Sequence, residues 1–73
     1  MNESVSVNRL AYNYVEIDLE TGECISVFTS SRERTGEEYI RIERYNEEYF
    51  GKFYRDGAWY EDAEFTIPWS PTV

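Results

Sequence analysis

Alternation of apolar and polar side chains is the feature that most restricts the fold of this chain. From Val15 to Leu19 every second side chain is apolar, and the side chains between them are carboxylates. The same period of two recurs in residues 24–29. This period is typical of a strand with one buried and one exposed face. The sequence therefore predicts two β-strands early in the chain, with Leu19 on the inward row.

The connection between these two stretches predicts a tight hairpin. A three-residue loop that ends at Gly22 would use the left-handed conformation that glycine adopts easily. Its register sets Ile17 opposite Ile25 and Val15 opposite Val27. We prefer it to a two-residue loop because it gathers the β-branched side chains on one face.

The middle of the chain fits two structures. Residues 38–45 have the tyrosine and isoleucine content of a strand. A helix over about residues 36–50 is the alternative, because Thr35 and Glu38 form a capping-box pattern and Gly51 stands where a helix-ending glycine would. The strand is the preferred interpretation, and the helix would make the fold α+β.

A second hairpin is predicted at Asp56-Gly57, a dipeptide that favours the turn between two paired strands. A two-residue turn pairs Tyr54 with Trp59, whereas a three-residue turn pairs Phe53 with Trp59. Both registers are compatible with the sequence.

These signals predict a mostly β protein with a single domain over residues 1–73. The expected architecture is a small antiparallel meander of about five strands that forms a barrel-like or rolled sheet. Residues 1–9, which are mostly polar but include Val5 and Val7, would be either a loose N-terminus or a short edge strand. Residues 68–73 would be an extended tail that begins at Pro68. Trp69 would either fold back to cap an open end of the barrel or act as an exposed docking anchor.

Composition argues against an enzyme. The chain has no histidine, so it lacks the Ser-His-Asp and Cys-His pairs that activate nucleophiles. Its single cysteine, Cys24, lies in an alternating stretch and is interpreted as a small strand residue. Asp18, Glu20 and Glu23 carry the oxygen ligands that calcium prefers, but their spacing differs from an EF-hand loop. We expect no catalytic residue, no cofactor and no metal site.

Cysteine usage and hydropathy indicate a cytoplasmic protein. A small secreted domain would carry several cysteines, and no stretch approaches the ~20 apolar residues of a membrane span. The N-terminus also lacks the pattern of a signal peptide. The chain is near the lower size limit for independent folding, which makes a homodimer a possible state.

Acidic side chains are concentrated at the two ends of the sequence. The chain has 15 acidic and seven basic residues, for a net charge of −8. Residues 1–31 hold five acids and one base, residues 32–55 hold six of each, and residues 56–73 hold four acids and no base. Such a field attracts basic proteins and repels nucleic acid and anionic membranes. We therefore expect neither direct nucleic-acid binding nor membrane binding.

Carboxylates on alternate residues of a strand form a row that could imitate a phosphate backbone, with nearby tyrosines as contact anchors. Two alternatives remain: the acids could serve solubility alone, or the arginines among the aromatic side chains of the middle segment could stack on single-stranded nucleic acid. We expect those arginines to pair with glutamates across strands instead. The candidate partner-binding residues are Tyr12, Tyr14, Glu16, Asp18, Glu20, Glu61, Asp62 and Glu64.

In its size, acidity, aromatic content and lack of catalytic residues, the chain resembles small bacteriophage host-takeover proteins of the DNA-mimic inhibitor type. The resemblance is one of composition and extends over the whole chain. It implies an inhibitor in the host bacterial cytoplasm that occupies the basic DNA-binding surface of a host protein, for example the histone-like nucleoid protein HU. The competing hypothesis is a structural or adaptor module that docks through its aromatic surface and the Trp69 tail.

Overall fold

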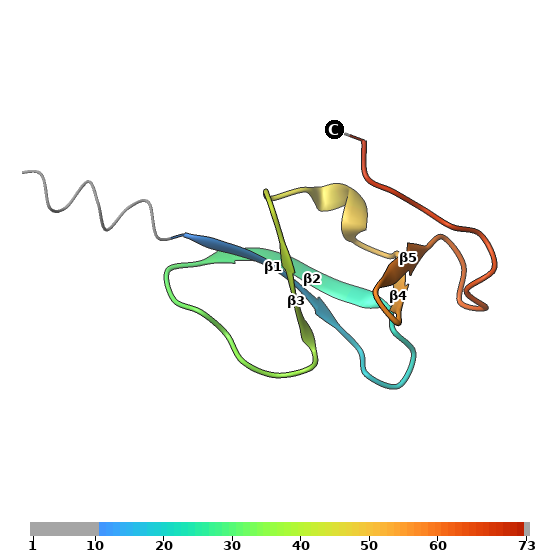
Figure 1. Ribbon diagram of the computed structural model, residues 1–73, viewed down its shortest axis with the longest axis horizontal. Helices are drawn as coiled ribbons and strands as arrows, with labels where there is room; N and C mark the ends of the chain where they lie inside the picture. The colour runs from blue at the N-terminus through green and yellow to red at the C-terminus, as the bar shows by residue number, and fades with distance from the viewer. Residues whose placement is uncertain (1–10, 73) are drawn as a thin grey trace, which may run out of the picture.

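The computed structural model describes residues 11–72, which form five short strands and one turn of 3-10 helix (Figure 1). The predicted mostly β, antiparallel class is confirmed. The prediction of a loose end or a short edge strand for residues 1–9 lies outside the described residues. The elements are β1 (Tyr12–Ile17), β2 (Cys24–Ser30), β3 (Tyr39–Ile42), η1 (Glu47–Tyr49), β4 (Phe53–Arg55) and β5 (Ala58–Tyr60).

The strands form two antiparallel sheets. The first has the order β2-β1-β3, with β1 in the centre, and the second is the β4-β5 hairpin. The predicted meander is therefore wrong, because β3 pairs with β1 and not with β2. The strands of the described residues do not close into a barrel.

Backbone hydrogen bonds connect the hairpin to the first sheet near the start of β2. The amide of Tyr54 donates to the Gly22 carbonyl at 2.9 Å, and the amide of Cys24 donates to the Lys52 carbonyl at 2.8 Å. In return, Gly51 donates to the Cys24 carbonyl at 3.2 Å. The segment that leads into β4 therefore pairs with the beginning of β2 on the side away from β1, but only over a few residues.

The β1–β2 register agrees with the prediction in its middle and departs from it near the turn. Val15 lies opposite Val27, as expected. Ile17 lies opposite Cys24 and not opposite Ile25, because a bulge interrupts the pairing after Glu16. The bulge leaves the Ile25 side chain 48% exposed. Burial of Ile25 beside Ile17, as implied by the predicted register, is wrong.

Gly22 has a positive φ of 83°, as predicted for the end of the loop. Its amide donates to the Asp18 carbonyl, which closes a turn wider than three residues. A Cβ atom at this position would come within 2.6 Å of the Tyr54 carbonyl, so only glycine fits without a shift. Leu19 lies in this turn and is 60% exposed, which contradicts its predicted inward position.

Residues 36–50 form a strand and a short turn, and the alternative of one long helix is wrong. The isoleucines of β3 alternate with polar residues, and Ile42 is buried in the core. After the strand, the Asn46 side chain accepts the Glu48 amide at 2.9 Å and starts η1. That helix ends after a single turn, before Gly51, whose φ is +85°.

The second hairpin adopts the two-residue turn. Asp56 and Gly57 both have positive φ, and Tyr54 lies opposite Trp59. The tail then returns along β5, because the Trp69 amide donates to the Trp59 carbonyl at 2.9 Å. Trp69 therefore folds back against β5, but its predicted role as the cap of an open barrel end is not confirmed, because the described strands form no closed barrel.

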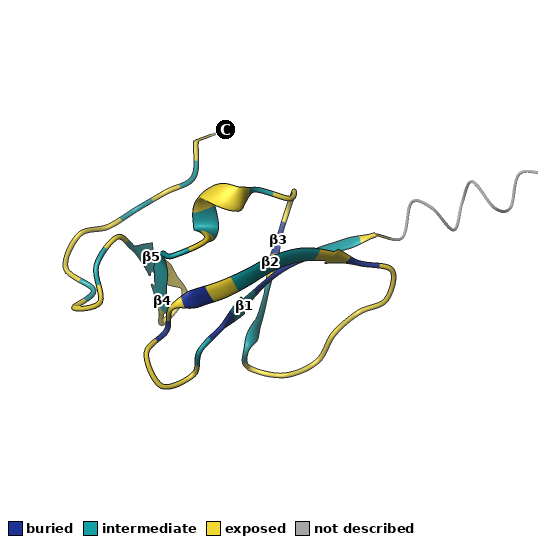
Figure 2. Ribbon diagram, turned by 180° about the vertical axis from the view of Figure 1, so that it is seen from behind, coloured by how far each residue is buried: buried dark blue, intermediate teal, exposed yellow. Residues whose placement is uncertain are grey.

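Buried side chains are concentrated in the three-stranded sheet (Figure 2). Val15 is fully buried, and three further apolar side chains pack around it on one face of the sheet. Tyr14, the neighbour of Val15 on the opposite face, is only 4% exposed. Both faces of β1 are therefore covered. No residue of the range 51–72 reaches the same degree of burial.

Candidate acidic binding surface

The face of β1 predicted to carry contact anchors is covered by the loop between β2 and β3. The Tyr14 ring packs against Phe28 and Tyr39, with centroids 5.8 and 6.1 Å away. The Tyr14 hydroxyl accepts the backbone amide of Arg34 at 2.9 Å. The Arg34 guanidinium then stacks over Phe28 at 5.2 Å. The prediction that Tyr14 is an exposed anchor is wrong, because a cation and two rings shield it from solvent.

Tyr12 and Glu16 lie on the same face as Tyr14 and are half-buried. The Arg41 guanidinium stacks over the Tyr12 ring at 4.6 Å. Tyr12 pairs with Ser30 at the far end of the sheet, away from the β1–β2 turn. The two tyrosines are therefore not beside the acids of that turn. The roles of Tyr12 and Glu16 in binding stay predictions.

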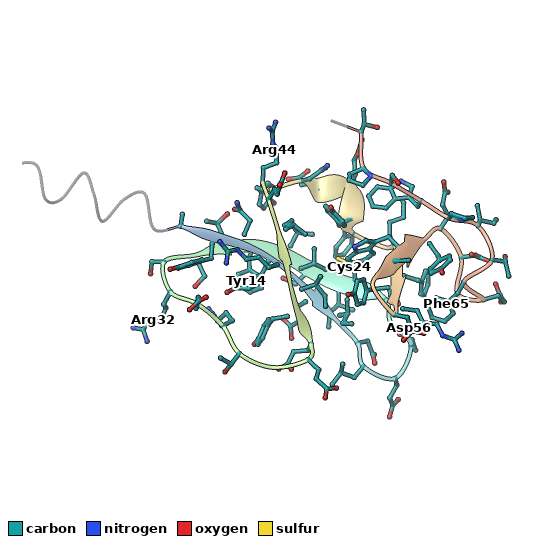
Figure 3. All side chains as sticks on the ribbon, viewed as in Figure 1. Tyr14, Cys24, Arg32, Arg44, Asp56 and Phe65 are labelled. Atoms are coloured by element: carbon teal, nitrogen blue, oxygen red, sulfur yellow. The ribbon has the colours of Figure 1, made fainter. Side chains whose placement is uncertain are left out.

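The remaining candidate acids lie on two segments that meet at one end of the molecule. Gly22 bonds to Tyr54, and a Cβ atom on Gly22 would lie 3.3 Å from the Phe65 ring. This contact brings the β1–β2 turn against the loop that follows β5 (Figures 1 and 3). We call the resulting surface the acidic end. It consists of Asp18, Glu20, Glu23, Asp56, Glu61, Asp62 and Glu64.

Two members of the acidic end, Glu23 and Asp56, were not among the predicted site residues. Each lies beside a turn glycine, Glu23 after Gly22 and Asp56 before Gly57. Both side chains are exposed. A carboxylate next to a predicted hairpin glycine is a sequence signal for a position at a turn, and it could have identified both residues.

Asp62 holds the loop after β5 in its conformation. Its carboxylate accepts the amides of Thr66 at 2.9 Å and Ile67 at 3.0 Å, together with the Thr66 hydroxyl. The hydrogen bond from the Thr66 hydroxyl, helped by the backbone amides, lowers the pKa of the Asp62 carboxyl below its ordinary value. Asp62 thus contributes charge to the acidic end but has its oxygens occupied by its own loop.

Phe65 is the side chain on which the acidic end packs. It has a φ of 58°, an unusual left-handed conformation for a bulky residue. Its ring packs edge-on against Tyr60 at 5.5 Å and Phe53 at 6.3 Å. These ring contacts and the Asp62 hydrogen bonds offset the backbone strain.

Cationic side chains stack on aromatic rings in place of the expected cross-strand ion pairs. Between residues of the range 11–72 the structure shows one ion pair, Arg55 to Asp56 at 3.9 Å, with both side chains exposed. The Arg55 guanidinium lies over the Phe65 ring at 5.1 Å, and the Lys52 ammonium over the Trp69 ring at 5.0 Å. An exposed ion pair such as Arg55–Asp56 contributes little to the stability of the fold. Most carboxylates of the described chain therefore keep an uncompensated charge.

Cys24 is buried, with 1% of its surface exposed, as expected for a small strand residue. Burial raises the pKa of its thiol and so disfavours the reactive thiolate. Within residues 11–72, no three potential ligands among Cys, Asp and Glu are arranged to hold a metal ion.

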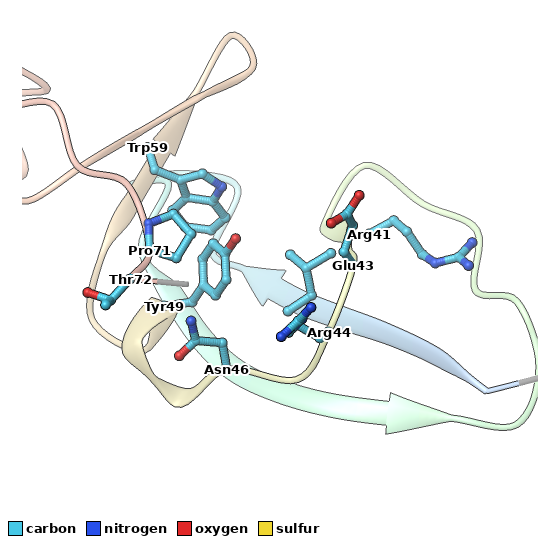
Figure 4. Close-up of a pocket in the computed structure, with 9 residues that line it drawn as sticks. Arg41, Glu43, Arg44, Asn46, Tyr49, Trp59, Pro71 and Thr72 are labelled. Atoms are coloured by element: carbon cyan, nitrogen blue, oxygen red, sulfur yellow. The ribbon is translucent and has the colours of Figure 1, made fainter.

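A hollow of about 380 Å³ lies between β3, η1, β5 and the tail (Figure 4). The rings of Tyr49 and Trp59 form one wall, while the Arg41 side chain extends away from them. A ligand site requires polar groups that converge on one point. This hollow lacks that arrangement among its lining residues.

Comparisons with known proteins found no family and no similar protein for this chain: it matches no protein-family model, and searches of curated proteins and of solved structures found no match. In the range 11–72, no helix has the length and hydrophobicity required to cross a bilayer.

Proposed function

We propose that this protein is a non-enzymatic binding protein whose acidic end occupies the DNA-binding surface of a basic host protein. A histone-like nucleoid protein such as HU is the kind of partner we expect. The protein would act as an inhibitor in the cytoplasm and would itself bind neither nucleic acid nor membrane. In this proposal, Glu20, Glu61 and Glu64 supply the charge that faces the partner.

The observation that supports the proposal is the placement of the cations. The acidic end has seven carboxylates. The segments that form it are residues 18–23 and 56–64, and among these residues and their immediate neighbours Arg55 is the one cation. Its guanidinium is stacked on Phe65 and close to Asp56 alone. In this position the guanidinium interacts with the ring of Phe65 and does not neutralise the other carboxylates of the acidic end. The field of the acidic end is therefore available to a basic surface.

Binding to purified HU at different salt concentrations tests the proposal. We expect binding that DNA competes away and that weakens at least about tenfold between about 50 and 500 mM salt, since contacts between exposed charges are screened. Absence of binding at low salt, or an affinity independent of salt, would contradict the proposal.

A pair of charge-matched variants locates the surface. The triple variant Glu20→Gln, Glu61→Gln, Glu64→Gln should weaken HU binding at least about tenfold, because rim charges act mainly through steering and complementarity. The control triple Glu33→Gln, Glu37→Gln, Glu43→Gln changes the net charge equally at exposed positions elsewhere. If both triple variants lost the same HU affinity, the effect would depend on net charge alone, and the acidic end would be rejected as the binding site.

A further inference from the structure

One edge of β2 carries backbone groups that no described segment pairs with. The Ile17 amide donates to the Glu38 carbonyl on the β3 side, so along β1 the odd-numbered residues face β3 and the even-numbered ones face β2. In the observed register this directs the backbone groups of Val27 and Thr29 away from β1. No backbone hydrogen bond from another part of residues 11–72 reaches them.

Within residues 11–72 this edge is unpaired because the segment that pairs with the beginning of β2 turns away from the strand. The segment that leads into β4 pairs with β2 only as far as Cys24. Upstream of Gly51, η1 stands beside β2 (Figure 1) and leaves a groove of about 430 Å³. The groove is lined by exposed apolar side chains: Ile25 is 48%, Tyr45 48% and Phe50 62% exposed. A free strand edge beside exposed apolar side chains is where an extended peptide can add as a further strand.

The charge around the groove indicates the chemistry of the occupant. Glu47 is the one charged residue that lines it, and its carboxylate accepts the Tyr45 hydroxyl at 3.3 Å. Glu23 is exposed just before β2. We propose that this groove binds an extended segment of a partner, rich in lysine or arginine with apolar residues between them, by strand addition to β2. A second copy of the chain would oppose its own Glu47 and a net charge of −8. The proposal stands whether or not the acidic end competes with DNA.

A defined peptide tests the proposal. The probe is a short peptide of alternating valine and lysine, and its control is the same peptide with an N-methyl group on every amide, so that neither edge of the peptide can donate. Methylation keeps the charge and the side chains but removes the donors that strand addition requires. We expect the methylated peptide to bind at least about tenfold more weakly. Hydrogen exchange of the Val27 and Thr29 amides should slow in the complex with the unmethylated peptide.

Protein variants separate the groove from general electrostatics. The double variant Ile25→Ala, Phe50→Ala removes two exposed apolar side chains of the groove at unchanged net charge, and it should weaken binding at least about tenfold. Leu19→Ala, which truncates a similarly exposed side chain in the β1–β2 turn, should change it less than about twofold. The triple variant of the acidic end should keep its sensitivity to peptide methylation, even if HU binding is lost. Native circular dichroism of each variant confirms the fold.

Three results would overturn the inference. Equal binding of the two peptides would show that charge alone holds them. Unchanged exchange at Val27 and Thr29 in a saturated complex would place the peptide elsewhere. A doubled mass in sedimentation of the free protein, with slow exchange at the same two amides, would identify a second copy as the occupant.

Discussion

The three-stranded sheet and the region from residue 51 to 72 use aromatic side chains in opposite ways. In the sheet, Tyr14 is 4% exposed and lies behind a fully buried Val15, so rings and aliphatic side chains cover both faces of one strand. In the second region no side chain is buried, and half-exposed rings pack edge to face, as Phe65 does against Phe53 and Tyr60. The comparison indicates that the free energy of folding comes mainly from the sheet. The hairpin joins the sheet through Tyr54 and Trp59, which pack against the buried cluster but stay partly exposed.

This difference bears on the acidic end. A densely charged surface costs stability through repulsion between like charges. Carboxylates on the buried sheet would transmit that cost to the whole fold. Glu61 and Glu64 instead lie in an exposed loop, which is held by the Asp62 side chain, the Phe65 ring and the backbone hydrogen bond from Glu61 to Ile67. We therefore expect changes in the second region to alter local structure and binding more than global stability.

The largest expected effect contrasts the same substitution in the two regions. Ile42→Ala should lower the free energy of unfolding by about 2–5 kcal/mol, because it leaves a cavity in the core. Ile67→Ala should change it by less than about 0.5 kcal/mol, since that side chain is 53% exposed. Urea denaturation of both variants measures the difference. Similar losses at the two positions would mean that the second region belongs to the same cooperative core.

A smaller effect is expected where the tail meets the sheet. The Trp69 ring packs against Tyr49 with centroids 5.2 Å apart and against Trp59 at 6.5 Å. Two such pairs, each worth about 0.5–1.5 kcal/mol, give a loss of about 1–3 kcal/mol for Trp69→Ala. The fluorescence of the remaining Trp59 should also shift to the red as water reaches it. An unchanged emission maximum would show that the tail does not shield Trp59 in solution.

The sequence predicted those parts of the fold that local rules determine. Alternation identified β1 and β2, and the need for a positive φ identified Gly22 and the Asp56-Gly57 turn. It did not predict that β3 pairs with β1, because pairing between strands distant in the sequence depends on which apolar faces become buried against each other. It also missed the bulge at Ile25, since one extra residue leaves no mark on a short alternating pattern.

The candidate site was predicted less well for a related reason. Alternation showed that the Tyr14 face is more polar than the Val15 face, but not that a polar loop folds over it. Arg34 makes this cover possible, because a guanidinium can stack on a ring while it stays close to water. Opposite charges in the sequence suggested ion pairs, and stacking on rings was the competing interaction that the charge count did not reveal.

The cover on the Tyr14 face should contribute about 0.5–1.5 kcal/mol through one hydrogen bond. Tyr14→Phe removes the hydroxyl that accepts the Arg34 amide and leaves the ring packing in place. Tyr12→Phe is the matched control, since no hydrogen bond to the Tyr12 hydroxyl is seen within residues 11–72. We expect faster hydrogen exchange at the Arg34 amide in the first variant only. Equal exchange in both variants would indicate that ring packing and the hydrogen bonds of the Ser30 hydroxyl to Arg32 hold the loop without the Tyr14 hydroxyl.

The smallest expected effect is the dependence of stability on pH at Asp62. Hydrogen bonds to its carboxylate lower its pKa in the folded protein, so the native state favours the ionised form. The resulting stabilisation is fully present above the carboxyl's ordinary pKa and is lost as the pH falls through the lowered one.

Asp62→Asn removes this stabilisation, so the difference in urea midpoint between the two proteins should be largest near neutral pH and shrink on acidification. Subtracting the variant in this way cancels the contribution of the other carboxylates, which relieve their mutual repulsion when protonated. The control is Glu64→Gln, which changes an exposed carboxylate in the same loop. The difference in urea midpoint between this variant and the wild type should not shrink on acidification in the same way. If the wild type had no advantage over Asp62→Asn even near neutral pH, the loop would be held by Phe65 packing instead of by the Asp62 carboxylate, and the second region would resemble the first more closely than its exposure suggests.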